Sequence, residues 1–123
     1  MYKLVILMES VSEPDFDESW PIFLHLAERM PGLLREATSR VEAVVFGEPS
    51  YTMIHELFFD SLEGVYAAMA SPSGKQAGSL LQKMTQGKMS LLIADHKEDA
   101  IENLLKYRAP EEDEAEGENN GVG

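Results

Sequence analysis

The chain has 123 residues, a formal net charge of −12 and no cysteine. Its length predicts a single domain, and its 44% hydrophobic and 26% charged residues are typical of a globular protein. The lack of cysteine excludes disulfides and thiolate chemistry and favours a reducing compartment, the cytoplasm. The acidic balance argues against nucleic acid and anionic membrane as partners, because phosphate binding needs clustered Lys and Arg.

The first half of the chain predicts a strand, a helix and a second strand. Residues 2–8 form a near-continuous apolar run typical of a buried strand, too short for a signal peptide or a membrane span. The stretch SEPDFDESW supplies helix-start residues, so we expect a helix over residues 15–30, which ends where Pro-Gly follows. Residues 34–46 predict a long strand, in part an exposed edge because it carries several charges.

The second half continues this pattern after the turn GEPS. Residues 51–59, YTMIHELFF, predict another well-buried strand. Asp60 or Ser61 caps the next helix, SPSG starts a further one, and residues 88–96 predict the last strand. This order predicts an α+β fold of the ferredoxin-like type (βαββαβ), an antiparallel four-stranded sheet with helices on one face.

The chain divides into three expected segments. These are a ferredoxin-like domain over residues 1–97, a C-terminal helical extension over residues 98–109 and an acidic flexible tail over residues 110–123. The tail carries six acids and no base, which leaves −6 of the charge of −12 to the rest of the chain. The strands are apolar on both faces, so a monomer would expose the face without helices. This predicts a homodimer through the sheet faces.

His55 and Tyr51, on the third expected strand, are the candidate catalytic residues. Alternation puts both on the face that points at the helices. We expect a cleft between sheet and helices, lined by Trp20, Phe23, Met53 and Phe59. A neutral histidine beside a phenol in an apolar cleft suits proton transfer on a small carbonyl or phenolic substrate. The alternative is a buried, hydrogen-bonded histidine with no reaction, which is favoured because no carboxylate is expected on this face.

The other charged residues and His25 are expected to have mainly structural or solvent-facing roles. His25 falls opposite the apolar stripe of its helix, so we expect it to face water. Glu56 points away from the cleft and can lie opposite Lys3, which predicts an ion pair on the dimer face that specifies assembly. Arg40 is either a clamp for an anionic substrate group or a solvent-facing residue of the edge strand. The histidines are isolated, so no metal and no cofactor is expected.

The motif MPGL followed by YTMIHELFFDSLEGVYAAMASPSGKQA resembles the EthD family of the dimeric α+β barrel superfamily. The resemblance rests on a strand ending in Phe-Asp-Ser, a helix with Ala repeats and the element Ala-Ser-Pro-x-Gly, and covers roughly residues 2–97. It implies a homodimer of ferredoxin-like subunits, each with a small, mostly apolar cleft. Relatives in the superfamily are cofactor-free cyclases, isomerases, monooxygenases and decarboxylases. Phe23 stands where EthD-like helices commonly carry a histidine, so one expected acid–base group is missing.

Within this motif, Pro72 suits the first helical position and Ser71 can cap the following amides, which predicts a structural joint.

Taken together, these features predict an EthD-like homodimer that binds a small apolar or aromatic molecule. It acts either as a cofactor-free enzyme or as a non-catalytic accessory or binding subunit for a neighbouring enzyme.

Overall fold

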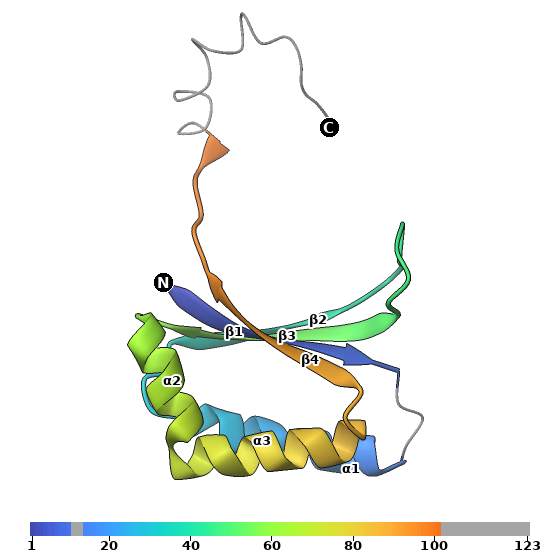
Figure 1. Cartoon of the computed structure of the whole chain (residues 1–123), viewed down its shortest axis with the longest axis horizontal. Helices are drawn as coiled ribbons and strands as arrows, with labels where there is room; N and C mark the ends of the chain where they lie inside the picture. Colours follow the sequence, from blue (N-terminus) through green and yellow to red (C-terminus); the bar gives the residue numbers. More distant parts are fainter. Residues whose placement is uncertain (11–13, 102–123) are drawn as a thin grey trace, which may run out of the picture.

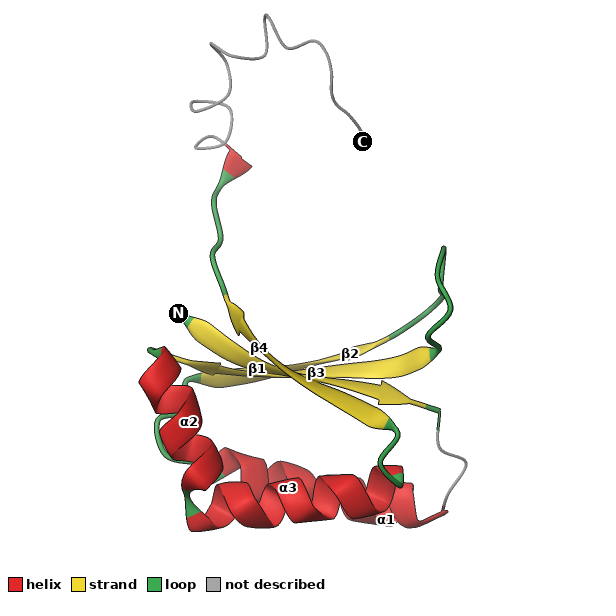
Figure 2. Cartoon of the chain, in the orientation of Figure 1, coloured by secondary structure: helices red, strands yellow, loops and turns green. Residues whose placement is uncertain are grey.

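The computed structural model describes residues 1–10 and 14–101. Its strands β1 (Tyr2–Glu9), β2 (Arg35–Arg40), β3 (Tyr51–Phe59) and β4 (Met89–Asp95) form one antiparallel sheet in the order β2-β3-β1-β4. The helices α1 (Pro14–Glu28), α2 (Leu62–Ala70) and α3 (Pro72–Thr85) all lie on one side of this sheet (Figure 1, Figure 2). The predicted ferredoxin-like α+β fold is therefore confirmed.

Local sequence explains how the helices begin and end. The hydroxyl of Ser61 accepts a 3.0 Å hydrogen bond from the N–H of Gly64 and caps α2. Ser71 caps α3 in the same way, through a 3.1 Å bond from the N–H of Gly74. After α1 the chain reverses at Gly32, whose φ of +82° is a conformation that glycine adopts without strain. The predicted joint between α2 and α3 thus consists of one serine that serves both helices.

The core lies between the sheet and the helices. Along β1, the side chains of Leu4, Ile6 and Met8 face the helices and are at most 6% exposed. Because strand residues alternate, the residues between them face the opposite side, which we call the open face. The open face carries Lys3, Val5, Leu7, Arg35, Ala37, Ser39, Ile54, Glu56, Phe58, Ser90, Leu92 and Ala94.

The second strand is shorter than the sequence predicts. It ends at Arg40, and residues 41–50 form a loop that projects from the sheet on the side of the open face (Figure 1). Strand β1, on the other side of β3, ends at Glu9 opposite Tyr51, so a longer β2–β3 hairpin would extend beyond the rest of the sheet. An unsupported two-stranded hairpin is marginal in water. Apart from residues 98–101, the predicted helical extension and acidic tail lie outside the described residues.

Candidate functional site

His55 lies in the middle of β3 and faces the helices. Its side chain is 1% exposed. The imidazole makes edge contacts with the rings of Trp20 and Phe23 on α1, with centroid distances of 5.3 and 5.9 Å. These are the two aromatic residues that the sequence pattern predicts beside it. The imidazole is therefore enclosed between the sheet and an aromatic helix face.

Both ring nitrogens of His55 have partners on β2. Nε2 lies 2.8 Å from Oε1 of Glu36, and Nδ1 lies 2.8 Å from Oγ1 of Thr38. The expectation that no carboxylate shares this face is wrong. The register pairs Thr38 with His55 and Glu36 with Leu57, so both β2 side chains face the helix side. The sequence conceals this, because the long loop before β3 leaves the register of the hairpin undetermined.

Burial lowers the pKa of His55 below its ordinary value, while the hydrogen bond and charge of Glu36 and the charge of Glu56 offset part of that effect. Helix α1 contributes the rings of Trp20 and Phe23 to the surroundings of the imidazole. The unfolded chain binds a proton at this histidine as the pH falls through about 6.5, whereas the folded chain binds it only at lower pH. Between these two pKa values the unfolded state holds more protons, so the folded state loses stability as the pH drops.

We expect the free energy of unfolding to fall by up to about 1.4 kcal/mol per pH unit just below pH ~6.5 because of His55. Urea denaturation in steps from about pH 7.5 to about pH 5.5 measures this dependence. His55→Gln keeps a hydrogen-bonding side chain but cannot take the proton, so it should flatten the curve. His25→Gln is the control, because His25 is exposed on α1 as predicted. An equally steep curve in His55→Gln would contradict this assignment.

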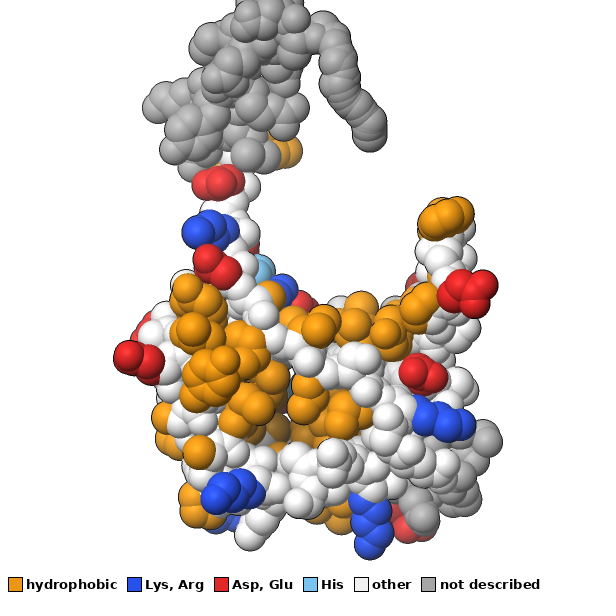
Figure 3. Space-filling model, viewed as in Figure 1, with side chains coloured by type: hydrophobic (Ala, Val, Ile, Leu, Met, Phe, Trp, Pro, Cys, Tyr) orange, Lys and Arg blue, Asp and Glu red, His pale blue; other side chains and the backbone are white. Residues whose placement is uncertain are grey.

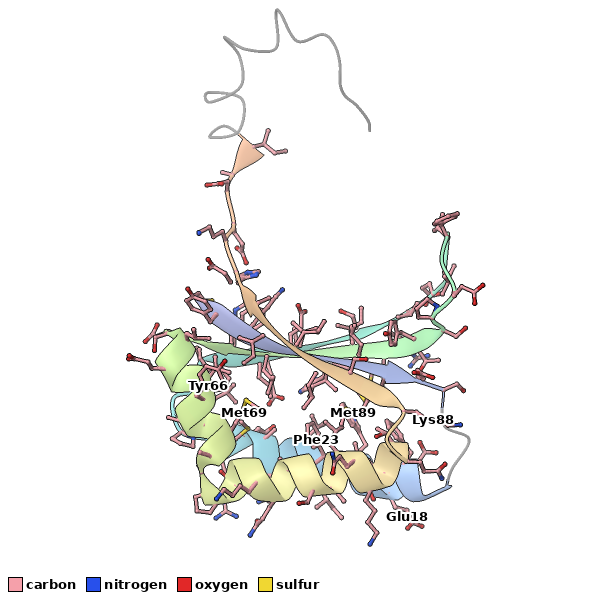
Figure 4. All side chains as sticks on the ribbon, viewed as in Figure 1. Glu18, Phe23, Tyr66, Met69, Lys88 and Met89 are labelled. Atoms are coloured by element: carbon pink, nitrogen blue, oxygen red, sulfur yellow. The ribbon has the colours of Figure 1, made fainter. Side chains whose placement is uncertain are left out.

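A cavity of about 470 Å³ lies between β1 and β4 on one side and the helices on the other. In Figure 4, Phe23, Met69 and Met89 point into the space between sheet and helices, and Figure 3 shows an opening on this face with hydrophobic side chains around it. The apolar lining comprises Leu4, Ile6, Phe23, Met30, Leu57, Met69, Ala77, Leu81, Met89 and Leu91. The volume of the cavity falls within the range of small-molecule pockets.

Helix α3 shapes the mouth of the cavity. Ala77 and Gly78 leave room on the side of α3 that faces the cavity, and Gly74 lines the cavity where α3 approaches the end of α2. The polar residues of the lining, Lys75, Ser79 and Gln82, are all exposed and therefore lie at the mouth. These residues were not predicted, because the expected cleft was lined by residues of α1 and β3. The sequence feature that could have indicated a cavity beside α3 is the row of small residues Gly74, Ala77 and Gly78 on one side of that helix.

The predicted cleft residues divide between two places. Phe23 lines the cavity, whereas Trp20, Met53 and Phe59 do not. Trp20 stacks on Phe16 and Phe23 at the His55 end of α1, and Phe59 is a core residue with 0% exposure. His55 itself does not line the cavity, although its neighbours Ile6, Phe23 and Leu57 do. The histidine thus lies next to the cavity wall but outside its lining.

Tyr51 is not beside His55. It pairs with Glu9 after an irregularity in the β1–β3 register and lines a shallow hollow with residues of the 41–50 loop and Ile54. Four residues of extended strand separate Tyr51 and His55, which is about 13 Å. The structure therefore does not support direct proton transfer between these two candidate catalytic residues.

The remaining predicted residues lie on the open face or at the sheet edge. Nζ of Lys3 lies 2.6 Å from Oε2 of Glu56. The residue directly opposite Glu56 is Val5, so the ion pair runs diagonally between β1 and β3 rather than straight across. Arg40 is exposed at the end of the edge strand β2.

Within residues 1–10 and 14–101, no group of three or more His, Cys, Asp or Glu side chains is arranged to hold a metal ion. In the same part of the chain, no helix has the length and hydrophobicity needed to cross a membrane.

No family model matches the chain. A curated protein from Rhodococcus erythropolis, an uncharacterized 11.0 kDa protein in the thcB-thcC intergenic region, is 25% identical over 99 residues. The match covers 79% of this chain and 96% of that protein.

Several solved structures share the fold. An EthD family protein from Bacillus halodurans C-125 is 26% identical with a TM-score of 0.71, over 79% of this chain and 99% of that one. A dimeric ferredoxin-like protein from Jannaschia sp. CCS1 is 16% identical with a TM-score of 0.61, over 77% and 98%. SnoaB, a cofactor-independent oxygenase from Streptomyces nogalater, is 10% identical with a TM-score of 0.58, over 81% and 95%. The last two likenesses concern the fold alone. The chain thus has a ferredoxin-like fold and is similar to an EthD family protein over most of its length.

Proposed function

We propose that the protein is a homodimer that binds a small, mostly apolar molecule in the cavity of each subunit. The observation that carries this proposal is the cavity of about 470 Å³, walled by apolar side chains of the sheet and all three helices. Lys75, Ser79 and Gln82 are all at its mouth. A ligand with an apolar or aromatic body and one polar end fits this arrangement.

The open face of the sheet supports the homodimer. Val5 and Leu92 are directly paired on this face, and Leu92 is 48% exposed. The charges of Lys3 and Glu56 are already paired with each other, so a second copy could cover them without leaving either charge unpaired. Arg35, the other charged residue of this face, lies 3.5 Å from Glu98 of the same subunit. A largely apolar face with its charges paired within the subunit suits an isologous contact with an identical face. The likeness to dimeric ferredoxin-like proteins points the same way.

The loop over residues 41–50 offers a further contact for the second copy. Its tip residues Val45 and Phe46 are each 96% exposed. The loop projects on the side of the open face, and Figure 3 shows the hydrophobic tip standing clear of the sheet. Sheets packed face to face lie about 10 Å apart, which is within reach of such a loop. We therefore expect these two side chains to pack on the partner subunit.

Cofactor-free turnover of the ligand is the second candidate function, favoured by the fold likeness to SnoaB. A reaction in the cavity would use the polar groups at its mouth, because His55 is not among the residues that line it. If the protein binds the ligand without transforming it, it acts as a non-catalytic accessory or binding subunit. The absence of cysteine fits our expectation that the protein works in the cytoplasm.

Gly78→Leu is expected to block the cavity without unfolding the protein. Gly78 lines the cavity, and a Cβ added there meets no atom within 4 Å, so a leucine side chain has room to occupy the ligand's space. Removing a glycine from a helix interior also stabilises the helix by about 0.5–1 kcal/mol. Gln76→Leu is the matched control, because it adds the same side chain to α3 outside the cavity.

Native mass spectrometry of protein purified without added ligand reports the subunit count and any retained small molecule together. Titration with the fluorescent apolar probe 1-anilinonaphthalene-8-sulfonate then measures affinity. We expect Gly78→Leu to raise its Kd at least about 10-fold, which is about 1.4 kcal/mol, and Gln76→Leu to leave it unchanged. Equal binding by all three proteins would contradict the cavity as the site, and a monomer would contradict the assembly. A retained molecule would then be tested for turnover.

A further inference from the structure

The hydrogen bonds around His55 form a chain of three groups, in which the buried imidazole bridges two side chains of the edge strand β2. The chain joins Glu36, His55 and Thr38, with 2.8 Å at each link. The imidazole is 1% exposed and the Glu36 side chain 21% exposed, while Thr38 is exposed on the edge strand β2. Thr38 is therefore the most exposed residue of the three.

The direction of these hydrogen bonds follows from the chemistry of the partners. An ionised carboxylate only accepts, so Nε2 of His55 carries the proton and donates to Glu36. Burial keeps the imidazole neutral, so Nδ1 has a free lone pair and accepts from the hydroxyl of Thr38. The carboxylate thus orients an imidazole whose basic nitrogen faces the hydroxyl proton.

The β2–β3 pairing holds this geometry in place. The N–H of Val41 donates to the carbonyl of Thr52, which makes that pair a hydrogen-bonded one. By alternation, Thr38 and His55 form a non-hydrogen-bonded pair, in which opposed side chains lie closest together. The N–H groups of residues 36, 38 and 40 then point away from β3, toward the sheet edge. A carbonyl oxygen bound at this edge would find backbone donors beside Thr38.

We propose that Thr38 is an acyl-acceptor nucleophile, activated by His55 as general base and by Glu36 as the residue that positions His55. The order carboxylate, imidazole and hydroxyl is the arrangement that activates a hydroxyl for acyl transfer on unrelated folds. The substrate class is a small carboxylic ester or thioester that reaches the exposed edge of β2. None of these three residues lines the cavity.

Each bond and each proton of the acyl transfer is accounted for by the substrate, water and these three side chains. Oγ1 of Thr38 bonds to the acyl carbon, its proton passes to Nδ1 of His55, and the bond from the acyl carbon to the leaving oxygen or sulfur breaks. Glu36 stabilises the imidazolium that forms. The imidazolium protonates the leaving group. A water molecule then attacks the acyl carbon, gives its proton to Nδ1, and Thr38 leaves with that proton. The net reaction is hydrolysis of the ester or thioester.

The test is acetylation of the full chain by 4-nitrophenyl acetate, followed by release of 4-nitrophenolate and by intact-protein and peptide mass spectrometry. We expect a burst of about one equivalent and one acetyl group on Thr38. Thr38→Val, of the same shape, should abolish both. His55→Gln should slow acylation by about 100-fold, and Glu36→Gln by at least about 10-fold. Acylation should also persist to lower pH than free imidazole catalysis does, because burial disfavours the protonated ring.

Thr52→Val is the matched control, since Thr52 is an exposed threonine of β3 whose hydroxyl donates to the carbonyl of Met8 and has no imidazole partner. Its burst should equal that of the unmodified protein. Acetylation confined to lysines or the N-terminus, or a burst that survives Thr38→Val, would overturn the proposal. Thermal denaturation of each variant separates loss of the reaction from loss of the fold.

Discussion

Gly74→Ala should lower the free energy of unfolding by about 3 kcal/mol or more. A Cβ at this position would lie 2.1 Å from the carbonyl oxygen of Ala68 and 2.9 Å from that of Met69. Both are backbone atoms at the end of α2, so no side-chain rotation relieves the contact. The joint between α2 and α3 would have to open, and with it the cap that Ser71 provides through the Gly74 N–H.

Gly78→Ala is the matched control for this prediction. It lies one helical turn further along α3, and a Cβ there meets nothing within 4 Å. We expect this variant to be more stable by about 0.5–1 kcal/mol, because alanine favours the helix. Urea denaturation monitored by circular dichroism compares the two. If both substitutions shifted stability in the same direction and by the same amount, the close approach of α2 and α3 at Gly74 would be wrong.

Leu92→Lys should convert the proposed dimer to a monomer. Leu92 lies on the open face opposite Val5 and is 48% exposed, so a lone subunit tolerates the change. In the dimer the two-fold symmetry would bury one unpaired ammonium group from each subunit. An uncompensated buried charge costs about 3–5 kcal/mol, which weakens association by at least about 100-fold.

Sedimentation-velocity analysis of the variant measures this change directly. Ile22→Lys is the matched control: Ile22 is 56% exposed, lies on α1 in the helix layer and should leave the dimer intact. A dimer that persists in Leu92→Lys but dissociates in Ile22→Lys would place the interface on the helices. Intact unfolding curves for both variants would show that only association changed.

The sequence by itself determined the features that depend on neighbouring residues. The strand YTMIHELFF has the predicted bounds, because its alternating apolar pattern is followed at once by the cap Ser61. The same alternation put His55 on the helix-facing side and Glu56 on the open face. The Ser-Pro-x-Gly element predicted the joint between α2 and α3. The motifs also indicated the EthD resemblance, and hence the sheet and its helix layer.

Only the tertiary structure decided what meets across the strands and helices. The register after the loop over residues 41–50 brought Glu36 and Thr38 to His55 and turned an apparently isolated histidine into part of a hydrogen-bonded chain. Tyr51 is far from that chain because it lies four positions before His55 on the same extended strand. A shift of one residue would have sent these β2 side chains to the other face, and nothing local in the sequence prevents it.

The cavity is also a tertiary property, because its volume is what remains after distant side chains have packed. Phe23, Met69 and Met89 come from α1, α2 and β4, and each position alone indicates only an apolar residue. The small residues of α3 become informative once that helix is known to face the sheet. Helix caps and strand alternation involve residues a few positions apart, whereas registers and cavities arise from contacts between segments far apart in the chain, which a local pattern does not encode.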